Sequence, residues 1–161
     1  MRQISNPYTR MPGYNCFGCS PHNPLGLAMS FFEDGDRVIS TWEPKEAYQG
    51  FSGVLHGGIQ ATLMDELASW FVMVQMRTSG MTEGIEVRYH QPVYTTGGTL
   101  TLTSELEDRN KRRVRILVRL FQGAAEESRS DAICTYAIFP EKLARKKLHY
   151  PGYEAFFAEP D

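Results

Sequence analysis

The chain has 161 residues, of which 42% are hydrophobic, and its formal net charge is −2. A chain of this length can bury one core without disulfides or metal ions, so we expect a single domain, residues 1–161. The small negative net charge argues against general binding to nucleic acid or to anionic membranes. No apolar run is as long as a membrane span and the first residues lack a signal-peptide core, which predicts a cytoplasmic protein.

The predicted elements follow a loop, residues 1–26, and form a core, residues 27–140. Two strands come first, at 27–33 and 37–42, joined by an Asp-Gly-Asp turn. A polar loop leads to one long helix, from about 58 to 77, and four more strands follow at 83–90, 99–107, 113–121 and 129–139. Because a doubly wound sheet would need a helix in each crossover, this order predicts an α+β fold with an antiparallel sheet curled around one helix. A charged and aromatic tail, 141–161, ends the chain.

The predicted helix separates bulky from small side chains when its residues are placed at 3.6 per turn. One stripe is bulky: Ile59, Leu63, Leu67, Trp70, Phe71 and Val74. The opposite side is small or hydroxyl-bearing around one acid: Ala61, Thr62, Asp65, Ala68, Ser69 and Val72. A helix that is apolar on nearly all sides is expected to be buried.

The strands after the helix alternate apolar and polar residues. This period of two predicts one buried face and one solvated face. The residues expected on the buried face are Ile85, Val87, Tyr89, Leu100, Leu102, Leu106, Val114, Ile116, Val118 and Leu120.

The motif His56-Gly57-Gly58 opens the helix, and Asp65 follows nine residues after the histidine. The two glycines leave the first free N–H groups of the helix unshielded, so its positive end can receive a carbonyl oxygen or an anion. Asp65 could instead lie on an exposed face, but its apolar neighbours argue against this; Glu66, at the edge of the bulky stripe, is the rival acid. A buried carboxylate and an open helix N-terminus together suggest acyl chemistry.

Cys16-x-x-Cys19 followed by His22 has the spacing of half a zinc site. The other half is missing, and Cys134 lies in a strand where a small apolar residue is expected. We therefore predict no metal and no cofactor, with ordinary packing of this pair in the N-terminal loop. Three cysteines, an odd number, fit a reducing compartment.

From about Asn15 to Phe139 the sequence resembles the hotdog-fold acyl-CoA thioesterases of the phenylacetyl-CoA and 4-hydroxybenzoyl-CoA type. The most specific match is the Leu-His-Gly-Gly motif with Asp65 nine residues beyond its histidine. Cys16-Phe17-Gly18-Cys19 with Asn23-Pro24-Leu25-Gly26-Leu27 is similar to the lead-in of one branch. The resemblance implies a hotdog fold and a hydrolase that cleaves the thioester of an acyl-coenzyme A.

The resemblance also implies roles for individual residues. Asp65 becomes the nucleophile or general base, the Gly57 amide polarises the thioester carbonyl with Gly58 beside it, and His56 shapes the turn near the thioester. A serine or threonine ten residues before a proline orients the attacking water in that family, and counting back from Pro92 gives Thr82. Where the family often has Asn or Gln, this chain has Gly50, and the adjacent Gln49 could serve if the loop shifts by one residue.

Gly57 and Asp65 are eight residues apart, about 12 Å along an α-helix at 1.5 Å per residue. They cannot act on one carbonyl from the same helix, which predicts a homodimer, or a homotetramer built as a dimer of dimers, with antiparallel helices and shared sites. Coenzyme A brings phosphates that call for cations. The first candidates are Arg109, Lys111, Arg112 and Arg113 in one hairpin, and a second cluster is Arg145-Lys146-Lys147.

Two other functions stay open at this point. A non-catalytic acyl-CoA-binding hotdog protein would not need Asp65 or Thr82. A hotdog hydratase acting on enoyl or hydroxyacyl thioesters would need a histidine and an acid to converge, for which His56 and Asp65 are the candidates. The expected core aromatics Phe51, Trp70, Phe71 and Tyr89 do not distinguish an aromatic from an aliphatic acyl group.

Overall fold

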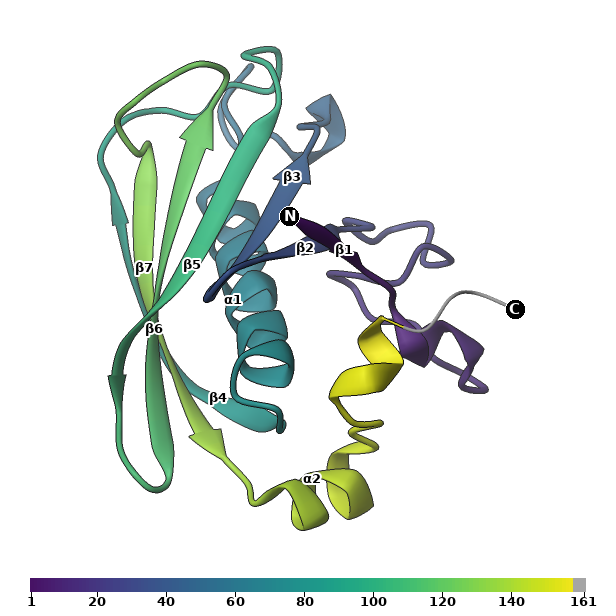
Figure 1. The fold of residues 1–161 in the computed structure, drawn as a ribbon. Helices are drawn as coiled ribbons and strands as arrows, with labels where there is room; N and C mark the ends of the chain where they lie inside the picture. Colours follow the sequence, from purple (N-terminus) through teal and green to yellow (C-terminus); the bar gives the residue numbers. More distant parts are fainter. Residues whose placement is uncertain (158–161) are drawn as a thin grey trace.

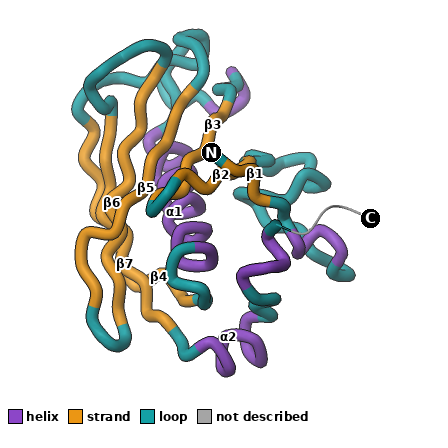
Figure 2. The backbone as a smooth tube through the Cα atoms, in the orientation of Figure 1, coloured by secondary structure: helices purple, strands orange, loops and turns teal. Residues whose placement is uncertain are grey.

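The computed structural model describes residues 1–157 and contains one antiparallel sheet wrapped around a helix (Figures 1 and 2). The strands run in the order β1-β2-β3-β5-β6-β7-β4, and each neighbouring pair is antiparallel. Their bounds are β1 (Arg2–Ile4), β2 (Ser30–Asp34), β3 (Arg37–Trp42), β4 (Gly80–Tyr89), β5 (Leu100–Arg109), β6 (Arg113–Gln122) and β7 (Ser130–Ile138). The central helix is α1 (Gly57–Val74), so the predicted α+β architecture is confirmed.

The predicted elements lie within a few residues of the observed ones. The largest differences at a strand start are three residues, at β2 and at β4, which begin at Ser30 and Gly80 where 27 and 83 were predicted. Strand β2 begins late because Leu27 and Met29 donate backbone hydrogen bonds to Phe17 and Gly18 in the N-terminal loop instead of joining the sheet. The sequence did not predict β1, the helix α2 (Glu141–Leu148), or the short 3-10 helices η1 (Pro7–Arg10), η2 (Glu46–Tyr48) and η3 (Tyr153–Phe156).

The bulky stripe of α1 packs against the concave side of the sheet. Leu63, Leu67 and Phe71 are fully or almost fully buried, as are the inward residues of β5 and β6: Leu100, Leu102, Val114, Ile116, Val118 and Leu120. The period-two prediction is therefore confirmed for the centre of the sheet. Neither helix within residues 1–157 combines the length and apolarity needed to cross a membrane.

Strand β4 departs from the predicted burial. It is the last strand of the sheet, and Ile85 and Tyr89 are 38% and 53% exposed although they pair with Cys134 and Ser130, which are buried. Leu106, near the end of β5, is exposed as well. The opposite, small-residue side of α1 is also only partly covered, since Ala61, Thr62, Asp65 and Ser69 are half-buried. The expectation of a helix buried on all sides is wrong for the single chain.

The C-terminal tail folds back onto the N-terminal loop beside the end of α1 (Figure 1). Phe156 is fully buried; its ring packs edge-on against Trp70, and its carbonyl oxygen accepts a hydrogen bond from the Ser5 amide (2.8 Å). The loop and the tail therefore extend the core around the C-terminal half of the helix. The last residues of the predicted tail, 158–161, lie outside the described part of the chain.

Candidate active site

The first turn of α1 is capped by the histidine that precedes it. His56 Nδ1 accepts a hydrogen bond from the Gly58 amide (2.9 Å), and the His56 carbonyl oxygen accepts from Ile59 and Gln60. Gly58, predicted to offer its N–H to a substrate, is therefore already engaged. Within residues 1–157 the Gly57 amide donates no hydrogen bond, which leaves it as the open donor at the positive end of the helix.

Tyr89 holds this helix start against β4. Its hydroxyl donates to the Gly57 carbonyl oxygen (2.8 Å), and a Cβ atom at Gly57 would lie 3.2 Å from the tyrosine ring. Glycine at this position thus permits the close contact. Tyr89 was predicted to be a core residue, but it reaches out from an edge strand whose outer side no strand covers.

A hollow of about 650 Å³ adjoins the Gly57 amide. Its walls come from the loop before α1 and from the end of β4: Gln49, Gly50, Phe51, Val54, Leu55, His56, Gly57, Gln60, Tyr89, His90, Gln91 and Pro92. Phe51 was expected in the core but is 84% exposed on this loop. The Gln49 side chain accepts a hydrogen bond from the Gly53 amide (2.9 Å), so it closes the loop as well as lining the hollow. The volume is in the range of small-molecule sites.

The Asp65 carboxylate is held by two hydroxyl groups from the sheet. Thr82 Oγ1 donates to Asp65 Oδ1 (3.1 Å), and Tyr136 Oη lies 2.6 Å from the same oxygen and 2.8 Å from the Asp65 carbonyl oxygen. Burial, and then the negative charge of Asp65, raise the pKa of Tyr136, so this hydroxyl stays protonated and donates. Within residues 1–157 Asp65 Oδ2 has no hydrogen-bond partner. Hydrogen bonds therefore fix Oδ1 of Asp65, while Oδ2 is open to a further contact.

Sequence reasoning placed Asp65 and Thr82 together but missed Tyr136. The available signal was the alternation of β7, which puts Tyr136 on the same buried face as Cys134. A buried tyrosine needs a partner for its hydroxyl, and Asp65 is the acid on the helix that β7 faces. The rival acid, Glu66, lies elsewhere: its carboxylate accepts from Trp70 Nε1 (3.0 Å) and contacts Cys16.

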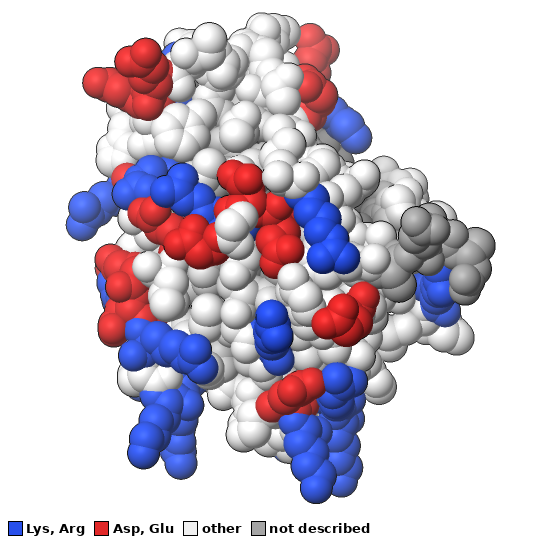
Figure 3. Space-filling view, in the orientation of Figure 1, with Lys and Arg blue, Asp and Glu red and all other residues white. Residues whose placement is uncertain are grey.

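The predicted basic cluster lies near the Asp65 end of the sheet. Thr82 pairs with Tyr136, which pairs with Val114 at the start of β6, directly after the hairpin. Figure 3 shows basic side chains gathered over this hairpin and over α2. Arg113 is occupied by an ion pair with Glu83, while exposed Lys111 and Arg112 line a hollow of about 950 Å³.

The open N–H and the carboxylate lie in separate parts of one chain. Gly57 begins α1 and Asp65 lies eight residues further along it, about 12 Å by helix geometry. The 650 Å³ hollow contains Gly57 and the end of β4, whereas Asp65 contacts Thr82 near the start of β4. One chain therefore presents the open amide and the open carboxylate oxygen in two separate places.

The family model described as the thioesterase superfamily matches residues 52–128, from the loop before α1 to the turn after β6. The match covers slightly less than half of the chain, and by it residues 52–128 are similar to the thioesterase superfamily. The matched segment holds Gly57, Asp65 and Thr82, while Tyr136 and the cysteine pair lie outside it. No curated protein is similar enough in sequence to count as a relative.

Solved structures of the thioesterase superfamily confirm the hotdog fold. A crystal structure of a thioesterase superfamily protein has a TM-score of 0.68 at 24% identity; the match covers 76% of this chain and 59% of that one, so this chain spans less than two thirds of its length. The Escherichia coli PaaI protein from the phenylacetic acid degradation operon has a TM-score of 0.63 at 13% identity, covering 71% and 82%. A Streptococcus mutans UA159 protein bound to acetyl CoA has a TM-score of 0.65 at 16% identity, covering 82% and 98%.

The cap at His56 generates a stability prediction. His56→Ala removes the acceptor for the Gly58 amide and should lower the free energy of unfolding by about 1 kcal/mol, within the roughly 0.5–2 kcal/mol that lost N-caps cost. His56→Asn supplies a new acceptor oxygen and should stay close to wild type. Denaturant unfolding of the three proteins measures both values. Equal loss in the two variants would show that His56 does not act as a cap.

Proposed function

We propose that this protein hydrolyses acyl-CoA thioesters with Asp65 as the reacting carboxylate. The observation that carries the proposal is the oriented Asp65, with one oxygen held by Thr82 and Tyr136 and the other open, on a helix whose first amide is free. Thioester hydrolysis needs a positioned base or nucleophile and a donor for the developing oxyanion. The similarity of residues 52–128 to the thioesterase superfamily supports this chemistry.

Asp65 Oδ2 is the atom available for the chemical step. It can take a proton from water, whose oxygen attacks the thioester carbon, or it can attack that carbon directly and form an anhydride that water then opens. In both routes the C–S bond breaks and the thiolate of coenzyme A leaves. The Thr82 hydroxyl donates a hydrogen bond to Asp65, and its oxygen keeps lone pairs that can accept a hydrogen bond from water.

In this proposal the Gly57 amide is the hydrogen-bond donor that polarises the thioester carbonyl. A preorganised donor at an oxyanion typically contributes about 10²–10³ in rate. Because Gly57 and Asp65 lie in separate places on one chain, the proposal requires a second copy of the chain. Within residues 1–157 no strand pairs with the outer edge of β4. A twofold pairing that sets Thr82 opposite Tyr89 of the second copy would bring the Asp65 end of one chain to the Gly57 end of the other.

Coenzyme A fits the basic hairpin in this arrangement. Lys111 and Arg112 are exposed and take part in no ion pair among residues 1–157, whereas Arg113 is held by Glu83. On the second cluster, Arg145 bonds to Glu141 and to the Pro151 carbonyl oxygen. We therefore assign the phosphate contacts to Lys111 and Arg112, with Arg113 positioning the hairpin.

Replacing the carboxylate tests the catalytic assignment. Asp65→Asn keeps the shape but removes the charge, and should lower turnover of an acyl-CoA by about 10²–10⁴, the usual scale for a lost general base. Glu66→Gln makes the same change at the neighbouring residue and should do much less. Release of free thiol from a panel of short, long and aromatic acyl-CoAs measures both variants. The opposite ranking of the two variants would remove Asp65 from its role.

Neutralising the hairpin tests the phosphate contacts. Lys111→Ala with Arg112→Ala should raise KM for acyl-CoA about tenfold, which corresponds to about 1.4 kcal/mol of binding, and should spare a pantetheine thioester without the nucleotide. Added salt should mimic the change, because exposed charges are screened over about 10 Å at 0.1 M. Lys146→Ala with Lys147→Ala removes the same charge from α2 and serves as the control. An equal effect of both pairs would contradict the assignment to the hairpin.

Mixing two inactive variants tests the shared site. Gly57→Pro removes the open amide, Asp65→Ala removes the carboxylate, and each should be nearly inactive alone. In a refolded equal mixture half of the dimers are mixed and each rebuilds one intact site, so about a quarter of wild-type activity should return. Proline is tolerated at a first helical position, yet the Tyr89 contact is close, so circular dichroism must show that Gly57→Pro folds. Background activity in a mixture with proven mixed dimers would refute the shared site.

A further inference from the structure

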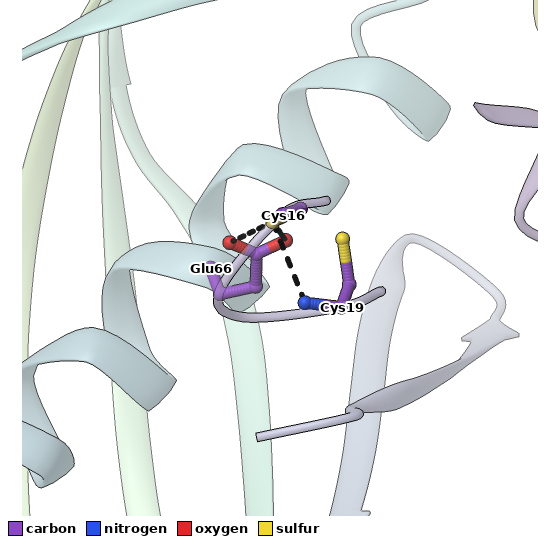
Figure 4. A group of neighbouring side chains, drawn as sticks. All are labelled: Cys16, Cys19 and Glu66. Carbon is purple, nitrogen blue, oxygen red and sulfur yellow. Dashed lines mark hydrogen bonds between the residues drawn. The ribbon is translucent and has the colours of Figure 1, made fainter. Parts of the chain in front are cut away.

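The cysteine pair of the N-terminal loop meets an acid of α1. Cys16 Sγ, Cys19 Sγ and a carboxylate oxygen of Glu66 all lie within 4.8 Å of one another. Cys16 Sγ is 3.6 and 3.7 Å from the two Glu66 oxygens, and Figure 4 shows the Glu66 side chain directed at the loop. In a tetrahedral zinc site with Zn–S of about 2.3 Å and Zn–O of about 2.0–2.2 Å, sulfur and oxygen ligands are about 3.5 Å apart. The spacing therefore matches a ligand set.

The loop is shaped to fit around this carboxylate. A Cβ atom at Gly18 would lie 2.4 Å from Glu66 Oε2, so a larger residue at this position would displace the carboxylate. Each potential ligand also has a polar neighbour: the Cys19 amide donates to Cys16 Sγ (3.4 Å), Tyr14 Oη lies 2.8 Å from Cys19 Sγ, and Trp70 Nε1 donates to Glu66 Oε1 (3.0 Å). Such outer partners orient metal ligands and stabilise their charges.

Cys16, Cys19 and Glu66 shift one another's pKa values. Hydrogen bonding from Cys19, aided by the Cys19 and Gly18 amides, lowers the pKa of Cys16 to about 5. Burial, and then the charge of Cys16, raise the pKa of Glu66 to about 7, and the hydrogen bond with Cys16 raises the pKa of Cys19. Three groups that ionise to anions therefore lie against one another in a partly buried site, where a bound cation would compensate their charges.

We propose that Cys16, Cys19 and Glu66 bind one zinc ion. Two thiolates and one carboxylate supply three of four tetrahedral positions, and soft thiolates select zinc over magnesium or calcium. The fourth position adjoins a hollow of about 370 Å³, which the three ligands line together with Tyr8, Tyr14 and Trp70. Water or a small donor ligand occupies it. His22, which the sequence offered as a partner, is exposed and outside the group.

The ion would join two parts of the chain beside a third. The ligands come from the N-terminal loop and from α1, and the adjoining hollow is also lined by His149, at the end of α2. Glu66 precedes Trp70 by one helical turn, and Trp70 packs against Phe156 of the tail. Binding therefore stabilises the docking of the loop and the tail on the C-terminal half of α1, because a ligand that binds only the folded state adds to its stability.

Metal binding by the full chain tests the proposal. The reduced protein, first treated with a chelator, is titrated with Co²⁺ and then with Zn²⁺. One cobalt per chain should give tetrahedral visible bands and a thiolate-to-cobalt charge-transfer band, and one equivalent of zinc should bleach both. Elemental analysis should find one zinc per chain, and the midpoint temperature of unfolding should rise with zinc concentration.

Variants assign the ligands. Cys16→Ser, Cys19→Ser and Glu66→Gln should each weaken cobalt binding by more than the roughly 10–100-fold lost when an outer partner is changed, and Tyr14→Phe should fall within that range. Cys134→Ala changes a buried cysteine outside the group and should bind like wild type. Glu66→Gln keeps both thiols and the shape, so it remains informative where a cysteine variant fails to fold.

Three results would overturn the proposal. The reduced wild-type chain could bind no cobalt, or Cys134→Ala could weaken binding as much as Cys16→Ser, or Glu66→Gln could bind like wild type. A reduced chain that binds no cobalt but closes a Cys16–Cys19 disulfide when treated with oxidised glutathione would identify a redox pair in place of the zinc site.

Discussion

The hydrogen bond between Tyr136 and Asp65 is the contact on which the candidate site depends. Asp65 is a charged residue on a helix that the sheet wraps. Removing its carboxylate from water costs free energy unless hydrogen bonds from the protein replace those from water. Tyr136 approaches both the side chain and the main chain of that one residue, so it fixes the carboxylate and joins α1 to β7 together. Thr82 adds a second donor from the edge strand. The orientation of the Asp65 carboxylate thus follows from the packing of the core.

Asp65 and Glu66 are consecutive, yet they serve different surroundings. Successive residues on an α-helix point about 100° apart, so one acid faces the hydroxyl groups of β4 and β7 while the other faces the thiols of the N-terminal loop. Neutral hydroxyl donors hold one oxygen of Asp65 and leave its other oxygen open. Glu66 lies beside two thiols, and together the three groups have the composition of a metal site. The sequence motif for one acid therefore gives no information about its neighbour.

Much of the architecture could be predicted from periodicity, and the failures have physical causes. Alternation located the strands after the helix, and the resemblance to hotdog thioesterases, applied at the spacings from His56 and Pro92, singled out Asp65 and Thr82, which lie in contact. Burial was mispredicted where it depends on neighbours, as for Phe51 on a loop and Tyr89 on an edge strand. The alternation of β7 places Tyr136 on the buried face but does not name its partner Asp65. The contact of Glu66 with the cysteine pair left no local pattern, because it joins residues distant in the sequence.

The exposed edge of β4 and the separation of Gly57 from Asp65 on α1 both point to pairing with a second chain. A helix of eighteen residues places its open amide and its carboxylate too far apart for one carbonyl. The sheet ends at β4, where Ile85 and Tyr89 are exposed. An unpaired strand edge favours pairing with another chain. A single twofold contact along β4 would bury the apolar side chains, cover the small-residue side of α1 and bring Gly57 of one chain to Asp65 of the other. Folding of one chain and completion of its site are then separate steps, and the second depends on protein concentration.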